Sequence, residues 1–252
     1  DSHDGIEWIF PPATTENMTD NQVHRVRANY RGLCEMIDHW FGKVLDTVDD
    51  LKLEGETVVV FLSDHGTMMG EQGQLHKAAN RLRHQCTQVP LIIRHPDRSA
   101  YGGKNVGAFV QHQDLMPTLL NLMNVDIPDR CLGSNLLPLV TGTADSVRDH
   151  VITAFGNYAS VRTRDWNYQT PWVKADWEAM PGSRNLTPPE LYDLKSDPDE
   201  LNNVVESHSD VAAQYHDRLL EYIQNNKPQT RGSLDVGESA FHEVPLFDQS
   251  RV

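Results

Sequence analysis

The sequence predicts an α/β domain followed by a smaller α+β appendage, and three patterns carry this prediction. Apolar residues recur at three- and four-residue steps from 20 to 53, which is typical of an amphipathic helix. Two continuous apolar runs, "TVVVFLSD" at 57–64 and "VPLIIRHP" at 89–96, have the β-branched composition of strands covered on both faces. A second helical run, "QDLMPTLLNLM" at 113–123, completes the alternation of helices and strands.

The limits of these helices follow from their terminal residues. Thr19 or Asp20 can cap the first helix, because a short side-chain oxygen accepts an otherwise unpaired backbone N–H. Gly55 marks its end. In the second helix we expect Asp114 to be the N-cap and Pro117 to lie in the first turn, where a missing N–H costs little.

Beyond Gly142 the pattern changes to that of antiparallel strands. The stretches at 150–155 and 159–170 alternate polar and apolar residues, and 189–194 is a candidate third strand. Three aromatic residues of this region could contact a substrate, but we expect them to pack in a core: Trp166, Tyr168 and Trp172.

The last predicted element is an amphipathic helix from Ser207 to Asn226, with Ser207 and Asp210 as a capping box. The change of character divides the chain into two parts. We expect residues 1–145 to form the α/β core and residues 146–252 to form a C-terminal subdomain with a small antiparallel sheet, one helix and a tail.

Charge and composition exclude several classes of function. The chain has 252 residues with 36 acidic against 22 basic side chains, a net charge of −14, which disfavours nucleic acid and anionic membranes as partners. No apolar stretch approaches the ~20 residues that span a bilayer. The first residues show neither an initiator Met nor a signal-peptide pattern. We therefore expect the interior of a longer protein, whose compartment the sequence does not reveal.

The stretch "LSDHGTMMGEQGQLHK", from Leu62 to Lys77, has the composition of a reactive site. Asp64 and His65 follow directly on a buried strand, at the end where ligands bind in open α/β sheets. A carboxylate beside an imidazole can supply half of a divalent-metal site. Gly66 allows a sharp turn or a positive φ after these two residues.

The rest of this stretch adds a charge that could act on a bound anion. Gly70 and Gly73 allow further turns around the carboxylate of Glu71, and Lys77 then presents an ammonium group on a flexible stem. A metal ion and an ammonium group together can bind a tetrahedral oxyanion. An Asp-His-Gly sequence after a strand can also be only a turn with a helix cap, and the local pattern leaves this alternative open.

The order of motifs resembles the type I sulfatases of the alkaline phosphatase superfamily. S-D-H-G is followed by G-E-x-G, by a lysine thirteen residues after the Asp, and by V-P-L-I-I-R-x-P. Three later stretches continue the resemblance in the family's order: 112–128, 131–140 and 190–204. The resemblance implies an alkaline-phosphatase-like sandwich, of which this chain would form the C-terminal half of the large mixed sheet with its flanking helices.

The resemblance also implies roles for individual residues. Asp64 and His65 would be metal ligands and Lys77 would contact the sulfate. His3 would be a substrate-side histidine, although it lacks the family's flanking prolines and is otherwise an ordinary loop residue. The implied cation is calcium, with magnesium, manganese and zinc as alternatives. The run "RLRHQ" at 81–85 would lie at the pocket rim or form a solvated helix face; we expect the latter.

One family element is missing from the sequence. The family's C/S-x-P-x-R motif, whose first residue becomes formylglycine, does not occur in this sequence. The stretch that begins at Ser196 is the most similar, but it has Glu200 in place of the arginine. We therefore expect formylglycine in an N-terminal half that would be this chain's partner. The predicted function is hydrolysis of a small sulfate ester. The alternatives are a phosphonate monoester or phosphodiester hydrolase, and a truncated relative without catalysis.

Overall fold

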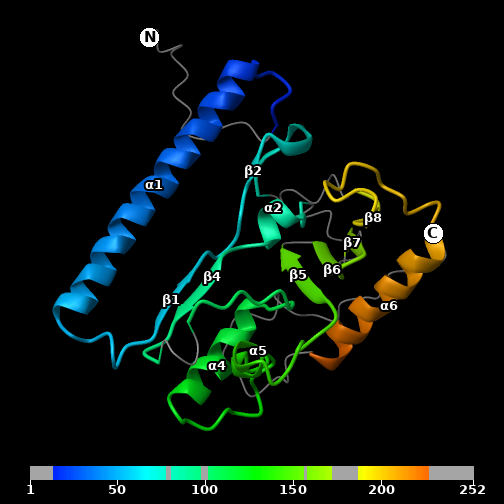
Figure 1. The fold of residues 1–252 in the computed structure, drawn as a ribbon. Coiled ribbons are helices and arrows are strands. Elements are labelled where there is room, and N and C mark those ends of the chain that lie inside the picture. Colours follow the sequence, from blue (N-terminus) through cyan, green and yellow to red (C-terminus); the bar gives the residue numbers. More distant parts are fainter. Residues whose placement is uncertain (1–13, 78–80, 98–101, 156–157, 172–186, 227–252) are drawn as a thin grey trace, which may run out of the picture. The chain divides into compact units, whose positions relative to one another are not determined.

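The computed structural model describes residues 14–77, 81–97, 102–155, 158–171 and 187–226 of the chain (Figure 1). The chain divides into two compact units. The first comprises residues 1–77 and 84–104, and the second comprises residues 78–83 and 105–252. The predicted boundary near residue 145 lies within the second unit and remains a prediction.

The first unit begins with the predicted long helix, α1 (Asp20–Asp50). Thr19 caps it in a capping box, in which its side chain accepts from the backbone of Gln22 and the Gln22 side chain accepts from the backbone of Thr19. The helix ends three residues earlier than predicted, because Lys52 has a positive φ of 58° that helical geometry does not allow.

Both predicted strands of the first unit are present and pair antiparallel with one another. They are β1 (Val59–Leu62) and β4 (Leu91–Arg94), with Val59 opposite Arg94 and Leu62 opposite Leu91. Phe61 packs against Phe41 of α1, with ring centroids 4.8 Å apart. We expected these strands to be covered on both faces, but Leu62 and Ile92 are exposed in this chain. That part of the prediction is wrong for the chain by itself.

A short hairpin, which the sequence did not predict, follows β1 in the first unit. Its strands are β2 (Met68–Met69) and β3 (Leu75–His76), and the 3-10 turn η1 (Glu71–Gly73) connects them. Met68 and Leu75 are buried, which anchors the hairpin. The unit also contains α2 (His84–Thr87), a single helical turn.

The second unit contains the other predicted helix, which starts with a 3-10 turn. The turn η2 (His112–Asp114) leads into α4 (Leu115–Leu122), and Pro117 lies in its first turn as predicted. A further short helix, α5 (Leu137–Thr141), ends at Gly142, whose φ of 75° is left-handed.

Asp114 occupies the N-cap position of α4, as predicted, but its carboxylate makes no capping hydrogen bond to that helix. The side chain is completely buried and accepts hydrogen bonds from both terminal nitrogens of Arg148 and from the backbone N–H groups of Gln111 and Ser134. A buried carboxylate requires such pairing, and its partner lies 34 residues away, beyond any local pattern.

A four-stranded antiparallel sheet forms the centre of the second unit. Its order is β5 (Val151–Phe155), β6 (Tyr158–Arg162), β7 (Trp166–Pro171) and β8 (Glu190–Asp193). The stretch predicted at 159–170 is therefore two strands, because the chain turns at Thr163, whose backbone N–H donates to the carbonyl of Trp166 over 2.9 Å.

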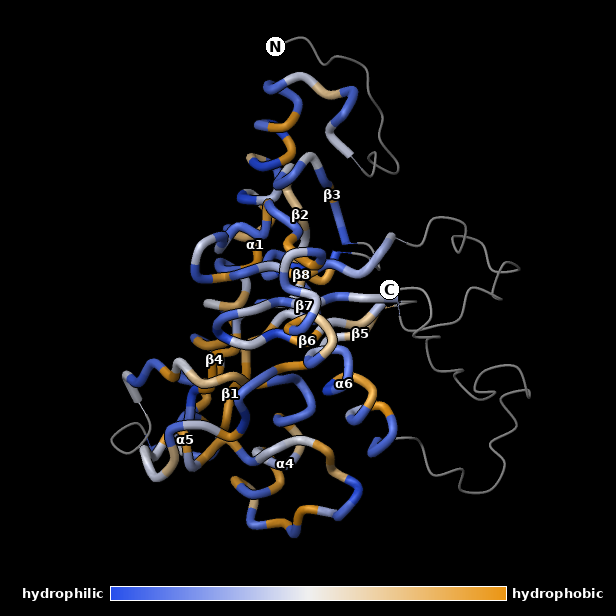
Figure 2. Tube along the Cα trace, turned by 90° about the vertical axis from the view of Figure 1, so that its right-hand side faces the viewer, coloured by the Kyte–Doolittle hydropathy of each residue, from blue (hydrophilic) through white to orange (hydrophobic). Residues whose placement is uncertain are grey.

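One face of this sheet packs against α6 (Ser209–Asn225). Residues of β6, β7, β8 and α6 form the buried core that they share, and hydrophobic segments alternate with hydrophilic ones along α6 (Figure 2). Its members are Ala159, Val161, Tyr168, Leu191, Ala212, Tyr215 and Leu219. The prediction that Tyr168 packs in a core is confirmed, Trp166 packs partly buried against it, and Trp172 lies outside the described residues.

The predicted capping box of α6 is wrong. The structure places the N-cap at His208, which makes no side-chain capping bond. Ser207 instead directs its hydroxyl to the carbonyl of Val204 over 3.1 Å. The helix forms without the box because its apolar face is buried, which stabilises it more than a surface cap does.

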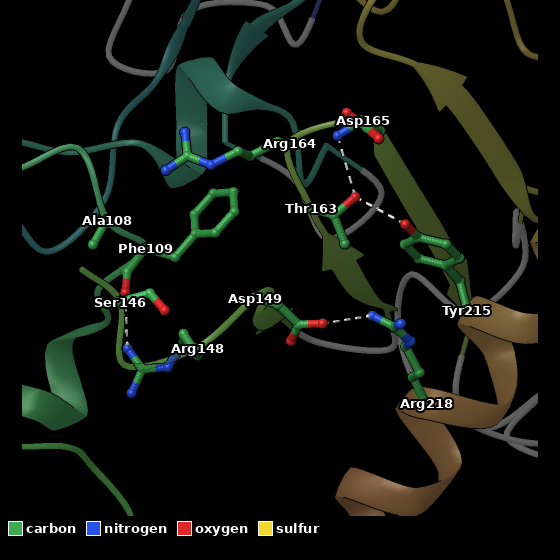
Figure 3. A pocket seen from close by; sticks show the side chains of 10 residues that line it. All are labelled: Ala108, Phe109, Ser146, Arg148, Asp149, Thr163, Arg164, Asp165, Tyr215 and Arg218. Carbon is green, nitrogen blue, oxygen red and sulfur yellow. Dashed lines mark hydrogen bonds and ion pairs between the residues drawn. The ribbon is translucent and has the colours of Figure 1, made fainter. Parts of the chain in front are cut away.

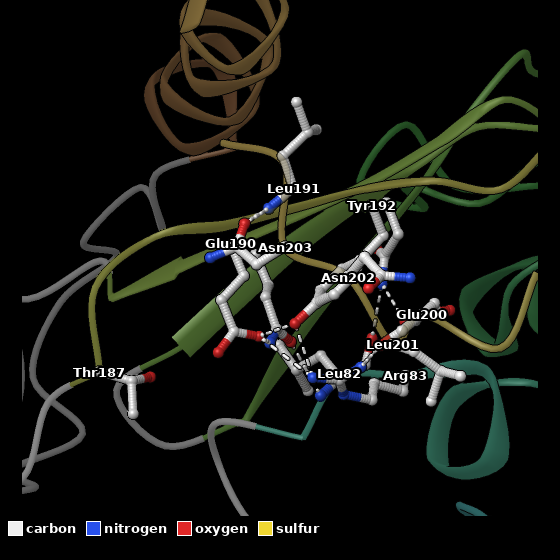
Figure 4. A network of polar contacts seen from close by, with 12 residues as sticks. Leu82, Arg83, Thr187, Glu190, Leu191, Tyr192, Glu200, Leu201, Asn202 and Asn203 are labelled. Atoms are coloured by element: carbon white, nitrogen blue, oxygen red, sulfur yellow. Dashed lines mark hydrogen bonds and ion pairs between the residues drawn. The ribbon is translucent and has the colours of Figure 1, made fainter. Parts of the chain in front are cut away.

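The run at 81–85 is not a solvated helix face. Leu82 is buried, and the guanidinium of Arg83 donates to the Tyr192 hydroxyl over 2.6 Å and to the Glu200 carbonyl (Figure 4). The same group lies 4.5 Å from the centre of the Tyr192 ring. Arg83 thus belongs to a polar network on β7 and β8, and helical structure begins only at His84.

Candidate active site

The candidate site begins where β1 ends. Ser63 follows the strand and donates its hydroxyl to the carbonyl of His65 over 2.8 Å, which closes a tight turn. Asp64, at the tip of this turn, is the most exposed of these residues, with 84% of its side chain accessible. The turn therefore presents a carboxylate to solvent at the end of a strand.

Asp64 and His65 are directly associated. The backbone N–H of His65 donates to Oδ1 of Asp64 over 2.8 Å, and Nε2 of His65 lies 3.4 Å from Oδ2. The backbone hydrogen bond from His65 is the main cause that lowers the pKa of Asp64, and electrostatic interactions with His65 and Lys77 add to it. The carboxylate is therefore held ionised, which is the form that binds a cation.

The hairpin β2–β3 brings Lys77 next to Asp64 and His65. Its Nζ lies 2.6 Å from Nε2 of His65, while Nδ1 of His65 lies 2.7 Å from the carbonyl of Gly66. An ammonium group has only donors, so Nε2 accepts and Nδ1 carries the proton that is donated to Gly66. The structure thus brings together Asp64, His65 and Lys77, three of the four residues predicted for the site.

The hairpin achieves this return through its glycines. Gly70 and Gly73 have positive φ values of 101° and 69°, as the predicted turns require. Glu71 lies between them, and its carboxylate accepts from the backbone N–H of Met69 over 2.5 Å. These turns place His76 opposite Met68 and so bring Lys77 back beside the end of β1.

Of the two roles predicted for Gly66, a sharp turn or a positive φ, the second is wrong, because its φ is not positive. Its N–H donates to the carbonyl of Cys86 over 2.8 Å, and a Cβ placed on it would lie 1.9 Å from the carbonyl oxygen of Gln85. Gly66 is thus required for the close approach of its backbone to α2. Because Gln85 and Cys86 contribute backbone atoms alone, no side-chain pattern could have revealed this support.

The donors present suit a divalent cation in part. Asp64 offers carboxylate oxygens and His65 an imidazole nitrogen, a pair that magnesium, manganese, zinc or calcium sites can include. Among the described residues, no group of three or more His, Cys, Asp or Glu side chains could hold a metal ion. His3, the fourth predicted residue, lies outside the described residues.

A separate hollow of about 480 Å³ lies in the second unit (Figure 3). Three arginines line it, and each has a partner. Arg148 pairs with Asp114, Arg218 lies 3.4 Å from Asp149, and Arg164 donates to the carbonyl of Gly107 over 2.7 Å. Each of the three guanidinium groups thus already interacts with a group of the same unit. None of the predicted site residues lines this hollow.

Two family models match this chain. The one described as "Sulfatase" matches residues 7–125, and the one described as "N-sulphoglucosamine sulphohydrolase, C-terminal" matches residues 70–225. The second match spans more than half of the chain. The chain belongs to the sulfatase family. Of the helices in the described part of the chain, none combines the length and hydrophobicity that crossing a membrane requires.

Individual relatives agree with this assignment. The chain is 31% identical to Arylsulfatase K of Xenopus laevis over 226 residues, which is 88% of this chain and 41% of that protein. It is 31% identical to the uncharacterized sulfatase YidJ of Escherichia coli over 196 residues, which is 75% of this chain and 36% of that protein.

A solved structure supports the fold as well. The phosphonate monoester hydrolase of Agrobacterium radiobacter matches with a TM-score of 0.70 and 25% identity, over 82% of this chain and 43% of that one. The alkaline-phosphatase-like fold is thus confirmed. The chain spans about two fifths of the length of the curated relatives that it matches.

Proposed function

We propose that the protein to which this chain belongs hydrolyses sulfate esters. The observation that carries the proposal is the convergence of Lys77 with Asp64 and His65 at the end of β1, with Nζ of Lys77 2.6 Å from His65. An ionised carboxylate, an imidazole and an ammonium group on a tight turn can bind a cation and an oxyanion side by side. The substrate would be a small sulfate ester.

Each residue would have a distinct role. Asp64 and His65 would supply two ligands to a divalent cation, for which calcium is our first choice and magnesium, manganese and zinc are alternatives. When bound, the cation would withdraw negative charge from the ester. Lys77 would leave Nε2 of His65, because that lone pair then faces the cation, and would contact the sulfate oxygens. His3 would contact the substrate from its other side.

The nucleophile would come from the N-terminal half of the same sulfatase, where we place a formylglycine. The family match to a C-terminal model and the span of about two fifths of the relatives' length support this division. This chain alone would then bind neither the cation nor the ester tightly and would be inactive. A truncated relative without catalysis is the alternative that the same facts leave.

A second candidate function is hydrolysis of phosphonate monoesters or phosphodiesters, because the structure of a phosphonate monoester hydrolase has a TM-score of 0.70 to this chain. Sulfate and phosphonate monoesters place similar oxyanions in the site. The test compares kcat/KM of the longer gene product on matched aryl sulfate and aryl phosphonate esters. We expect the sulfate ester to be preferred. Preference for the phosphonate would overturn the sulfatase proposal, and activity on neither would favour the non-catalytic relative.

A further inference from the structure

The residue directly before Lys77 has an unusual backbone conformation. His76 is the last residue of β3, and its φ of 61° lies in the left-handed region that few residues other than glycine adopt. A side chain costs free energy there, because its Cβ comes too close to the following carbonyl oxygen. Backbone strain of this kind clusters at active sites and ligand-binding segments.

The imidazole of His76 does not account for this conformation. Its Nε2 is buried and has no hydrogen-bond partner in the part of the chain that the structure describes. A buried polar atom without a partner is a second unfavourable contribution at the same residue. What the left-handed conformation does change is the path of the chain after β3.

Strand geometry indicates where Lys77 would point without this conformation. Successive side chains of a strand point to opposite faces, so residues two apart share a face. An extended His76 would therefore keep Lys77 on the face of Leu75, whose side chain is only 1% exposed. Lys77 is instead exposed, and its Nζ lies 2.6 Å from Nε2 of His65. The chain leaves the strand pattern at the left-handed residue.

The hairpin that precedes this point is held in place. His76 pairs with Met68 of the neighbouring strand β2 (Figure 2), and the side chain of Met68 is buried. The carbonyl of Met69 accepts a hydrogen bond from Nε of Arg27 in α1 over 2.8 Å. Because the hairpin is fixed, one left-handed residue at its end is enough to set the direction of the next side chain.

We propose that His76 is a positioning residue for Lys77: its left-handed backbone turns the Lys77 side chain out of β3 toward His65. This inference rests on the proposed function for the role of Lys77 toward the sulfate. The imidazole itself takes no part in the chemistry. Histidine suits the position because, with Asn and Asp, it enters the left-handed region several times more often than other residues that carry a side chain.

The test compares two substitutions at position 76 in the longer enzyme. Asparagine also enters the left-handed region, so His76→Asn should keep kcat and kcat/KM on an aryl sulfate within about threefold of the wild type. Valine is branched at Cβ and resists this region, so His76→Val should lower kcat by roughly tenfold to a hundredfold, because Lys77 is then misplaced. KM should change little, as for a group that acts in the transition state.

A double substitution tests whether His76 acts through Lys77. His76→Val combined with Lys77→Ala should be as active as Lys77→Ala alone, within about threefold, because the direction of a side chain that is absent has no further effect. The matched control is Lys52→Val, which changes the exposed left-handed residue that follows α1. It should lower the melting temperature about as much as His76→Val does and leave the rates unchanged.

Crystal structures of the two variants at position 76 test the same point without substrate. Lys77 should lie beside His65 in His76→Asn and away from it in His76→Val. If the wild-type enzyme hydrolyses neither sulfate nor phosphonate esters, the proposed function fails, and these structures still decide whether His76 positions Lys77.

Any of four results would overturn the proposal. His76→Val could retain rates within about threefold of the wild type, or Lys77 could lie beside His65 in the crystal structures of both variants. His76→Asn could be as slow as His76→Val, which would assign the role to the imidazole. The losses from His76→Val and Lys77→Ala could multiply in the double variant, which would show that His76 acts independently of Lys77.

Discussion

Nζ of Lys77 lies 2.6 Å from Nε2 of His65, although twelve residues separate them in the sequence. The contact uses the lone pair of the nitrogen that would bind a cation, since Nδ1 is engaged with the carbonyl of Gly66. Lys77 and a cation would therefore compete for the same atom. Cation binding would release Lys77 toward the substrate.

The first prediction concerns catalysis by Lys77. In the longer enzyme, Lys77→Ala should lower kcat and kcat/KM together by roughly 10²–10³, because a donor that stabilises developing charge acts mainly in the transition state. Lys77→Arg should restore little, since a planar guanidinium does not reproduce a compact ammonium. The melting temperature should hardly change, because Lys77 is exposed. Steady-state kinetics on an aryl sulfate, with Lys43→Ala as control, decides the matter; rates within about threefold of wild type would contradict the assignment.

The second prediction concerns the cation. Asp64→Ala should reduce the divalent-cation content of the longer enzyme and lower its melting temperature, since a bound metal stabilises only the folded state. The lower melting temperature should result from the loss of a metal ligand, because the Asp64 side chain is exposed and contributes little to packing. The readout is elemental analysis, with Asp38→Ala on the exposed segment of α1 as the matched control. Unchanged metal content would exclude Asp64 as a ligand.

The third prediction concerns the support of the turn by Gly66. Gly66→Ala should destabilise the first unit by roughly 1–3 kcal/mol, because the added Cβ would meet the carbonyl oxygen of Gln85 at 1.9 Å. Gly42→Ala on α1 is the control: no atom lies within 4 Å of its added Cβ, and it should stabilise the helix by about 0.5–1 kcal/mol. Chemical denaturation measures both. Equal effects of the two substitutions would show that the close approach at Gly66 carries no constraint.

The fourth prediction concerns pH. Burial lowers the pKa of His216, whose Nδ1 lies 3.2 Å from the hydroxyl of Tyr168. As the pH falls below ~6.5, the unfolded chain therefore binds more protons than the folded chain. The stability that the neutral, buried imidazole of His216 contributes is thus present above that pH and is lost as the pH falls through the folded-state pKa. His216→Gln should reduce the difference in melting temperature between pH 7.5 and pH 5.

The control for this titration is His24→Gln, which changes an exposed histidine of α1 and should leave the difference as in the wild type. Tyr168 does not interfere, because burial raises its pKa to about 12 and its hydroxyl stays protonated throughout this range. An undiminished pH dependence in His216→Gln would show that the buried imidazole does not titrate with unfolding.

Local periodicity was a reliable guide to the elements. The apolar steps of α1, the β-branched runs of β1 and β4 and the helical run of α4 each became the expected element. Their ends were less predictable, because a single positive φ at Lys52 ends α1 early and one turn divides the stretch at 159–170. Asp114 holds the predicted N-cap position, but its carboxylate pairs with Arg148 and not with the helix terminus, because a charge-assisted bidentate pair is the stronger interaction.

The sequence by itself determined the main helices and strands and the candidate residues of the site, because helical period, strand composition and the order of Asp64, His65 and Lys77 are all properties of neighbouring residues. Only the tertiary structure decided the contacts between distant segments. It joined Lys77 to His65, Arg83 to Tyr192 and Gly66 to the backbone of α2. Such contacts depend on burial and on chain reversal over many residues, and no short stretch of sequence encodes them.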